Sequence, residues 1–363
     1  MLNRVEVEGY KSIEKQTIEL GALNVLIGAN GSGKSNVLSV FDFVGAVVRG
    51  DLGSHVAQAG GAARILRASR QEQEMSLKFA FDPNEYRIVF RQGVAGELVV
   101  ANESAAFQGK GFEEPFRINI SKGSLESRLG DLADARGKAT AKWVHSEMAS
   151  WKRFHFHDTM PTADVRAYAR VDDNHELRRN GENLAAFLYR LSISQPGHFE
   201  QIQISIRSVA PYVRGLTLAP SGINAEHIKL AWRHANSDAY FDGADLSDGT
   251  LRYIALATVL LQPDPPKLIV IDEPELGLHP KAIAHLAELL YSASKRTQVI
   301  VATQSVTLID CLDLGDVITV DLDGDKSIFR RLDAGELAPW LEDYSLGELW
   351  QKNLLGARPQ WQG

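Results

Sequence analysis

A glycine-rich segment, Gly28-Ala29-Asn30-Gly31-Ser32-Gly33-Lys34-Ser35, constrains the fold of this chain more than any other feature. It follows an apolar run at residues 23–27 that has the length of a buried strand. An apolar segment of helical length, from about Ser35 to Val48, comes after it. Glycines let successive backbone N–H groups curl round an anion, and the positive end of the following helix faces the same point. The segment therefore predicts a phosphate-binding loop between a buried strand and a helix.

The residue types in this loop indicate a nucleotide and a magnesium ion. The pattern is G-x-x-x-x-G-K-[ST], in which Asn30, Gly31, Ser32 and Gly33 form the anion-binding turn. Lys34 can reach the β- and γ-phosphates, and the Ser35 hydroxyl can bind Mg²⁺. A plain glycine-rich turn would be the structural alternative, but the flanking strand and helix are the context that nucleotide binding requires.

A second apolar strand, residues 268–271, ends in the two carboxylates Asp272 and Glu273. Asp272 can hold Mg²⁺ across from Ser35, and Glu273 can polarise an attacking water as a general base. Strands often end in acidic turns, so this pattern gains its meaning from the phosphate-binding loop. The long separation of Lys34 from Asp272 excludes a small GTPase-like or kinase-like domain.

Just upstream lies Leu246-Ser247-Asp248-Gly249-Thr250, a turn at the start of a predicted helix. Ser247 and Gly249 there would form a second anion-binding helix N-terminus. The chain already holds the phosphates at Lys34, so a second site serves a purpose if two copies pack head to tail. A simple N-cap without a ligand is the alternative.

The order of predicted elements indicates a largely parallel sheet in the second half of the chain. The expected elements there are a helix at about 250–262, a strand at 267–271, a helix at 280–294 and a strand at 298–302. Short strands are expected near the N-terminus, at Met75–Phe81 and at Tyr86–Phe90, and a helix is expected near 182–192. We expect residues 1–363 to form one folded unit. Its parts are 1–50 (with the phosphate-binding loop), 51–150 (a variable insertion), 151–245 (a lobe of helices and strands) and 246–363 (the C-terminal half).

Composition excludes several classes of protein. Hydrophobic residues make up 44% and charged residues 23% of the 363 residues, which is ordinary for a globular protein. No apolar run has the length of a membrane span, and the single cysteine, Cys311, excludes an intrachain disulfide and a cysteine-based zinc cluster. The net charge of −7 argues against a uniformly basic nucleic-acid binder. We expect a cytoplasmic protein without a membrane partner.

These motifs together resemble the ABC-type ATPases of the RecF, SMC and OLD lineage, in particular the bacterial ATPases without a coiled coil. The resemblance rests on 28–35, 246–250 and Asp272-Glu273-Pro274-Glu275-Leu276-Gly277-Leu278-His279-Pro280. It implies an α/β P-loop NTPase fold with an antiparallel β subdomain and a helical lobe. It also implies a head-to-tail homodimer that binds ATP and Mg²⁺, with Ser247 and Gly249 serving the partner's nucleotide.

The resemblance suggests further nucleotide contacts and one departure. Lys11 and Ser12, after an aromatic residue, and Asn36, after Ser35, are expected near the nucleotide, with a solvated turn as the alternative. Related proteins usually carry a histidine after the strand at 299–302, where this chain has Gln304. Glutamine donates a hydrogen bond but carries no charge. We expect Gln304 to sense the γ-phosphate and turnover to be modest; the alternative is a polar strand end.

The segment 151–159 alternates aromatic residues and histidines, so His155 and His157 would share one face of a strand. With Asp158 they could ligate a metal, although no third partner is identified. The resemblance suggests instead that His157 or Asp158 contacts the metal-bound water or the γ-phosphate. Ordinary core packing is the remaining alternative.

Two further stretches invite a function. Basic residues at 136–153, with Trp143 and Trp151 between them, could hold a nucleic-acid backbone, or could be a solvated helix face with core tryptophans. The basic residues are Arg136, Lys138, Lys142, Lys152 and Arg153, with Arg178 and Arg179 as an extension or as partners of acids. The acidic run Asp321–Asp325 is better explained as a hairpin turn than as a nuclease site.

Two functions remain open. The first is ATP hydrolysis at a dimer interface, coupled to DNA metabolism and repair or to phage defence. The second is an ATP-gated scaffold or clamp that regulates a partner with slow hydrolysis. A nuclease or toxin activity would come from a partner protein. A transporter subunit is disfavoured by the long separation of the two motifs.

Overall fold

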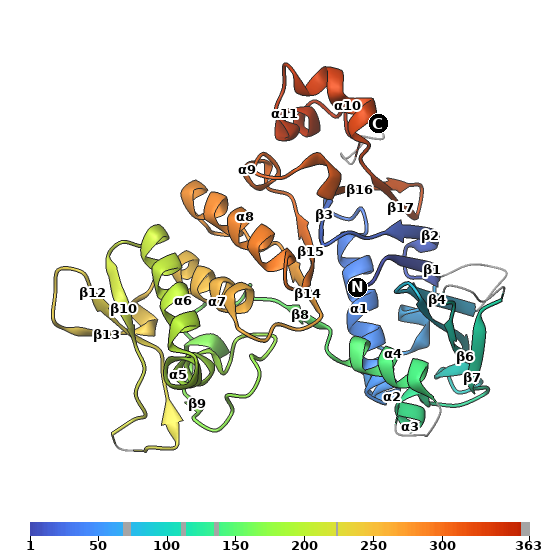
Figure 1. Ribbon diagram of the computed structural model, residues 1–363, viewed down its shortest axis with the longest axis horizontal. Helices are drawn as coiled ribbons and strands as arrows, with labels where there is room; N and C mark the ends of the chain where they lie inside the picture. The colour runs from blue at the N-terminus through green and yellow to red at the C-terminus, as the bar shows by residue number, and fades with distance from the viewer. Residues whose placement is uncertain (68–73, 110–113, 134–137, 223, 357–363) are drawn as a thin grey trace.

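Two six-stranded sheets organise the chain, with helix α1 (Lys34–Val48) packed between them (Figure 1). The computed structural model describes residues 1–67, 74–109, 114–133, 138–222 and 224–356. Apolar side chains of α1 share one core with the antiparallel sheet and with one face of the second sheet. A separate core covers the other face of the second sheet. The predicted α/β architecture is confirmed.

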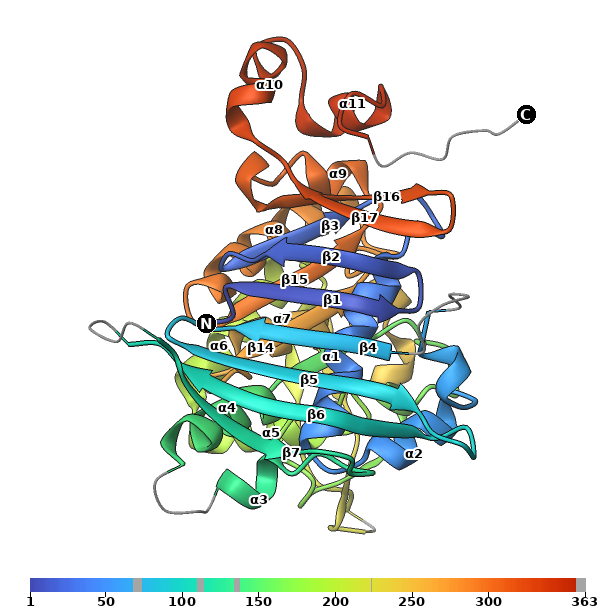
Figure 2. The same cartoon turned by 90° about the vertical axis from the view of Figure 1, so that its right-hand side faces the viewer.

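The first sheet is antiparallel and forms a broad face, seen front-on in Figure 2. Its strands in spatial order are β2 (Ile13–Glu19), β1 (Arg4–Tyr10), β4 (Glu74–Ala80), β5 (Asn84–Gln92), β6 (Leu98–Phe107) and β7 (Phe116–Ser121). Alternation drives its burial, because Met75, Leu77 and Phe79 of β4 face the core while their neighbours face outward. β1 pairs with both β2 and β4, so the N-terminal strands and much of the 51–150 part form one sheet.

The second sheet holds the predicted parallel strands. Its spatial order is β17 (Lys326–Arg331), β16 (Val317–Asp323), β3 (Leu23–Ile27), β15 (Gln298–Thr303), β14 (Leu268–Asp272) and β8 (Lys152–Phe154). All neighbours are parallel except β16 and β17. Every residue of β3, β14 and β15 is buried, as expected for strands covered on both faces. The carboxyl ends of β3, β14 and β15 therefore meet at one edge of the sheet.

The acidic run near the C-terminus is a hairpin turn. β16 and β17 pair from Ile318 with Arg331 to Asp323 with Lys326, and Gly324 in the turn has φ 61°. A turn of this kind needs left-handed backbone, which glycine adopts at little cost. The predicted hairpin turn is confirmed.

Helices cover the outer face of the second sheet and form the helical lobe. The lobe contains α5 (Leu184–Ser194), α6 (Pro196–Val209), α7 (Asp248–Leu261) and α8 (Pro280–Ser294), with the small sheet of β10 (Val213–Thr217), β12 (Ala231–His234) and β13 (Tyr240–Asp242) and the pair β9 (Ala169–Arg170) and β11 (His227–Ile228). The other α-helices of the described residues are α2 (Leu52–Gln58), α3 (Leu129–Ala133), α4 (Ala139–Ala149), α9 (Val306–Ile309), α10 (Ala334–Leu341) and α11 (Leu346–Gln351). α5, α7 and α8 lie where the sequence predicts helices.

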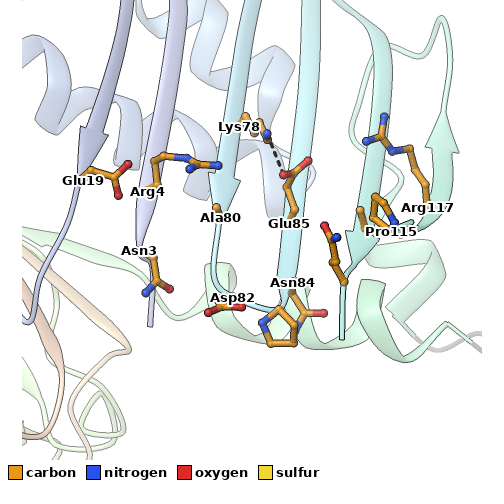
Figure 3. A pocket seen from close by; sticks show the side chains of 13 residues that line it. Asn3, Arg4, Glu19, Lys78, Ala80, Asp82, Asn84, Glu85, Pro115 and Arg117 are labelled. Atoms are coloured by element: carbon orange, nitrogen blue, oxygen red, sulfur yellow. Dashed lines mark ion pairs between the residues drawn. The ribbon is translucent and has the colours of Figure 1, made fainter. Parts of the chain in front are cut away.

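The outer face of the antiparallel sheet carries a polar hollow (Figure 3). Lys78 and Glu85 form an ion pair of 2.9 Å across it, and Arg4, Glu19 and Arg117 also line it. Among the described residues that line it, none belongs to the motifs above. Within the described part of the chain, no helix is both long enough and apolar enough to cross a membrane.

Candidate nucleotide site

The glycine-rich loop joins β3 to α1 as predicted. Gly31 and Gly33 have φ of 83° and 107°, conformations that favour glycine. Lys34, at the first turn of α1, is 5% exposed, and its Nζ donates to the carbonyls of Gly28 (2.6 Å) and Ala29 (2.9 Å). Burial lowers the pKa of Lys34. The ammonium therefore lies inside the turn that the motif builds for an anion.

β14 brings the two predicted carboxylates to this loop. Ser35 Oγ donates to Asp272 Oδ2 over 3.4 Å, so the hydroxyl and the carboxylate face one point. Glu273 has φ 43°, and its N–H donates to Ala302 O at 2.8 Å. Oxygen ligands of this kind are what Mg²⁺ prefers, so Ser35 and Asp272 fit the predicted magnesium site.

Gln304, after β15, connects the loop to Glu273. Its Nε2 donates to Glu273 Oε1 at 2.7 Å and to Asn30 Oδ1 at 2.6 Å. The amide thus uses both of its hydrogens within the candidate site. The structure therefore brings Asn30, Glu273 and Gln304 together across three strand ends.

Glu275 is a site residue that the sequence analysis did not single out. It is 9% exposed, and burial raises the pKa of its carboxyl group. Oε1 accepts hydrogen bonds from Thr303 Oγ1 (2.5 Å) and from the N–H of Gln304 (3.4 Å), while Oε2 is buried without a hydrogen-bond partner. Glu275 thereby fixes the end of β15 from which the Gln304 side chain projects. The sequence feature that could have identified Glu275 is its position two residues after Glu273.

Lys11 and Ser12 lie beside the first turn of α1, and Asn36 is part of that turn. Asn36 Nδ2 donates to Ser12 Oγ at 2.6 Å, and Lys11 Nζ donates to Ser39 Oγ at 2.9 Å. Ser327 on β17 also reaches this turn, with its Oγ 2.7 Å from Ser12 Oγ and donating to Ser32 O at 2.7 Å. No local sequence signal points to Ser327. The predicted nucleotide contacts of the first three residues stay predictions.

The histidine segment runs alongside β14. β8 ends at Phe154, where the sequence predicts a longer strand, yet the alternation continues: Phe154 and Phe156 are buried, while His155 and His157 are exposed. The ring Nε2 of His157 is 2.9 Å from the carbonyl oxygen of Asp272. In the described residues, no group of three or more His, Cys, Asp or Glu side chains is placed to hold a metal. The segment therefore lies against the candidate site without forming a metal centre.

The tryptophans of the basic stretch pack in the core, Lys152 and Arg153 form ion pairs, and Lys142 is exposed. Trp151 is buried among Phe41, Phe79 and Phe81, and Trp143 contacts Phe81. The ion pairs join Lys152 to Glu176, Arg153 to Asp42 and Asp272, Arg178 to Asp173, and Arg179 to Asp42. Arg136 lies outside the described residues. The core tryptophans and the acid partners of Arg178 and Arg179, which the sequence analysis gave as alternatives, are observed.

The predicted second anion-binding turn begins α7. Ser247 is the exposed N-cap, and its Oγ accepts from Thr250 N at 3.2 Å. A Cβ on Gly249 would come within 2.4 Å of the carbonyl oxygen of Gly277, so this turn packs against the loop that follows Glu273. Within the described part of the chain, no hydrogen bond joins Ser247 or Gly249 to residues 28–35.

Two buried arginines, which the sequence analysis did not single out, support this turn. Arg166 donates to Thr159 O (2.8 Å), to Gly243 O (2.7 Å) and to Leu246 O (3.1 Å). Arg252 donates to Phe156 O at 2.8 Å and to Leu276 O. Hydrogen bonds from these two arginines therefore connect the turn before α7, the histidine segment and the loop after Glu273.

This fold and this loop define a P-loop ATPase. Residues 23–310 match the family described as "AAA domain, putative AbiEii toxin, Type IV TA system", and the chain belongs to that family. The chain is also similar to the SmcHead in its crystal structure with the C-winged helix domain of ScpA (TM-score 0.60, 16% identity, covering 93% of this chain and 99% of that one).

A second similar structure is the Smc head domain with an extended coiled coil, bound to the C-terminal domain of ScpA derived from Pyrococcus furiosus. It has a TM-score of 0.56 and 16% identity, and the match covers 94% of this chain and 98% of that one. At this identity the likeness shows the fold. None of the curated proteins matches the sequence. The predicted likeness to SMC-type ATPase heads is confirmed, and the RecF- or OLD-like assignment stays a prediction.

Proposed function

We propose that two copies of this chain bind ATP between them, head to tail, and hydrolyse it with Mg²⁺ as cofactor. The observation that carries the proposal is the pair of hydrogen bonds from Gln304 to Asn30 and Glu273. These bonds gather one loop residue, one candidate base and one amide donor at the edge of the sheet where Lys34 begins α1. A γ-phosphate in the loop would lie among these three side chains.

Each residue has a role that follows from its chemistry. Lys34, now held by two loop carbonyls, exchanges them for the β- and γ-phosphate oxygens. Ser35 and Asp272 hold the metal, which when bound neutralises charge on the phosphates. Lys11 and Ser12 contact the nucleotide from the turn between β1 and β2, and Asn36 contacts it from the first turn of α1.

Glu273 orients and deprotonates the attacking water, because its carboxylate is half-buried and lies beside the phosphate-binding loop. Gln304 donates a hydrogen bond to the γ-phosphate, exchanging one of its present acceptors for a phosphate oxygen. Glu275 holds the backbone of Gln304 in place. An amide supplies no positive charge, and we therefore expect slow turnover.

The first experiment compares ATP hydrolysis by the wild-type protein and by Glu273→Gln, with ATP binding measured in parallel. We expect a rate loss of about 10²-fold or more with binding retained. Glu288→Gln on α8 is the matched control, because its side chain is 76% exposed and its partner is His285. Equal rates for wild type and Glu273→Gln would overturn the enzymatic role.

A second experiment tests the contribution of Ser247 and Gly249 from the partner copy. Lys34→Ala and Ser247→Arg should each abolish hydrolysis alone. Mixed in equal amounts, they should recover about a quarter of the wild-type rate, because half of the dimers are mixed and each mixed dimer has one intact site. No recovery on mixing would contradict the head-to-tail arrangement.

The partner is proposed to be an effector protein of the toxin type, in phage defence. The family description names a toxin and a type IV toxin–antitoxin system. Arg153 and Arg179 are engaged in ion pairs and Trp143 in a core contact, which leaves these side chains less available to DNA. Hydrolysis measured with and without double-stranded DNA separates the alternatives. Stimulation by DNA would favour DNA metabolism or repair instead.

A second candidate function is an ATP-gated scaffold, favoured by the uncharged Gln304. In that case Glu273→Gln would lose hydrolysis yet retain the protein's biological activity in cells. Loss of both hydrolysis and biological activity would indicate that the biological activity depends on hydrolysis.

A further inference from the structure

Arg153 lies between the candidate metal-binding carboxylate and helix α1. From β8, its Nη2 donates to Asp272 Oδ2 at 3.0 Å, and its Nη1 donates to Asp42 Oδ2 at 2.9 Å. Asp272 Oδ2 is the same oxygen that accepts from Ser35 at 3.4 Å. The guanidinium thus occupies one side of the oxygen that the magnesium site requires.

The charges along this contact alternate in sign. Asp272, Arg153, Asp42 and Arg179 form a chain, since Arg179 Nη1 donates to the second oxygen of Asp42 at 2.9 Å. The side chains of Asp272, Asp42 and Arg153 are only 11%, 17% and 21% exposed. Solvent therefore screens these charges less than it would on the surface.

Arg153 is not fully satisfied by this arrangement. Its Nε is buried and has no hydrogen-bond partner. Asp42 is shared between Arg153 and Arg179, and Asp272 is the second carboxylate that Arg153 contacts. A cation bound at Ser35 and Asp272 would meet the positive charge of Arg153 beside the same oxygen, and like charges repel.

We propose that Arg153 is a built-in counter-ion of Asp272 that competes with the divalent metal, so that the metal enters the site together with the nucleotide. This inference rests on the proposed function only in taking Asp272 as a metal ligand. The phosphates of a bound nucleotide add the negative charge that outweighs Arg153. Asp42, on the far side of the guanidinium, retains the arginine when Asp272 turns to the metal.

The test is a titration of the nucleotide-free protein with Mn²⁺, followed by electron paramagnetic resonance of the free ion. Arg153→Gln should bind Mn²⁺ at least about tenfold more tightly than wild type. Lys152→Gln, the neighbouring residue on β8 with its own partner Glu176, is the matched control and should bind as wild type does. Adding Asp272→Asn to Arg153→Gln should remove the gain.

Arg153→Met, which keeps the length of the aliphatic chain, replaces the glutamine variant if thermal unfolding shows the latter to be poorly folded. Unchanged Mn²⁺ affinity in the folded variant, or a gain that survives Asp272→Asn, would overturn the proposal. If the wild-type protein hydrolyses Mg-ATP but Arg153→Gln binds Mn²⁺ no more tightly than wild type, the proposed function stands and the counter-ion role of Arg153 is refuted. A gain in a chain that hydrolyses no ATP would support the counter-ion and refute the enzyme.

Discussion

Replacing Gly249 with alanine should force apart the two turns that meet at the start of α7. Gly249 is the second residue of this helix, and a Cβ there would lie 2.4 Å from the carbonyl oxygen of Gly277, whereas ordinary contact begins at 3.4 Å. Backbone has to move by about 1 Å to relieve this overlap, and overpacking of this kind costs about 1–3 kcal/mol. Alanine also favours the helix by up to about 1 kcal/mol, which hides part of the cost.

Gly197 provides a control for the helical term. It is the second residue of α6, which has 14 residues as α7 does, and nothing lies within 4 Å of a Cβ built there. Both alanine variants therefore share the gain in helix propensity, and only Gly249→Ala carries the steric cost. The free energy of unfolding of Gly249→Ala should fall below that of Gly197→Ala by about 1–3 kcal/mol.

Urea unfolding followed by circular dichroism measures this difference from the two midpoints. The reasoning is refuted if Gly249→Ala unfolds at the same urea concentration as Gly197→Ala or at a higher one. A lower midpoint with unchanged slope would mean that the native contact, and not the compactness of the unfolded chain, was altered.

Three further perturbations test other parts of the structure. Burial raises the pKa of Glu275 above its usual 4.5, so the folded protein holds a proton that the unfolded chain releases, and stability falls as pH rises through the folded-state pKa. Glu275→Gln should therefore gain stability over wild type between about pH 5 and pH 8, and an equal difference in urea midpoint at both ends would contradict this assignment. Trp151→Ala removes a side chain that is 3% exposed and should lower the free energy of unfolding by about 3–5 kcal/mol; a loss under about 1 kcal/mol would place the ring outside the core. Arg166→Gln leaves buried carbonyls of the turn before α7 unpaired, and we expect slower hydrolysis with ATP affinity retained, measured by steady-state rate and by nucleotide titration. Weakened ATP binding would instead indicate that Arg166 supports the phosphate-binding loop of its own chain.

Elements with a strong local signal were predictable from the sequence. β3, β14 and β15 are largely continuous apolar runs, a pattern that is typical of strands buried on both faces. The helix expected at 280–294 has the bounds of α8, because Pro280 sits in its first turn and apolar residues recur at helical spacing. The carboxylates that end β14 were predictable because a strand end places them at the edge of the sheet.

Contacts between distant segments were not predictable in this way. β6 and β7 were missed because their apolar residues mix with small and polar ones, and their pairing with β5 supplies much of their order. Arg153 looked like part of a basic surface, since its partners Asp42 and Asp272 lie far away in the chain. Charge in a sequence says nothing about which acid a basic side chain will meet after folding.

The position of β3 in the centre of its sheet also bears on how the protein is made. This early strand pairs with β15 on one side and with β16 on the other, and both come near the end of the chain. At a ribosomal rate of ~5–20 residues per second, β3 waits roughly 15–60 s for both neighbours to be synthesised. The hydrogen bonds that join residues 30–35 to Asp272, Gln304 and Ser327 can form only after that time. The nucleotide site is therefore completed only when nearly all of its sheet has been synthesised.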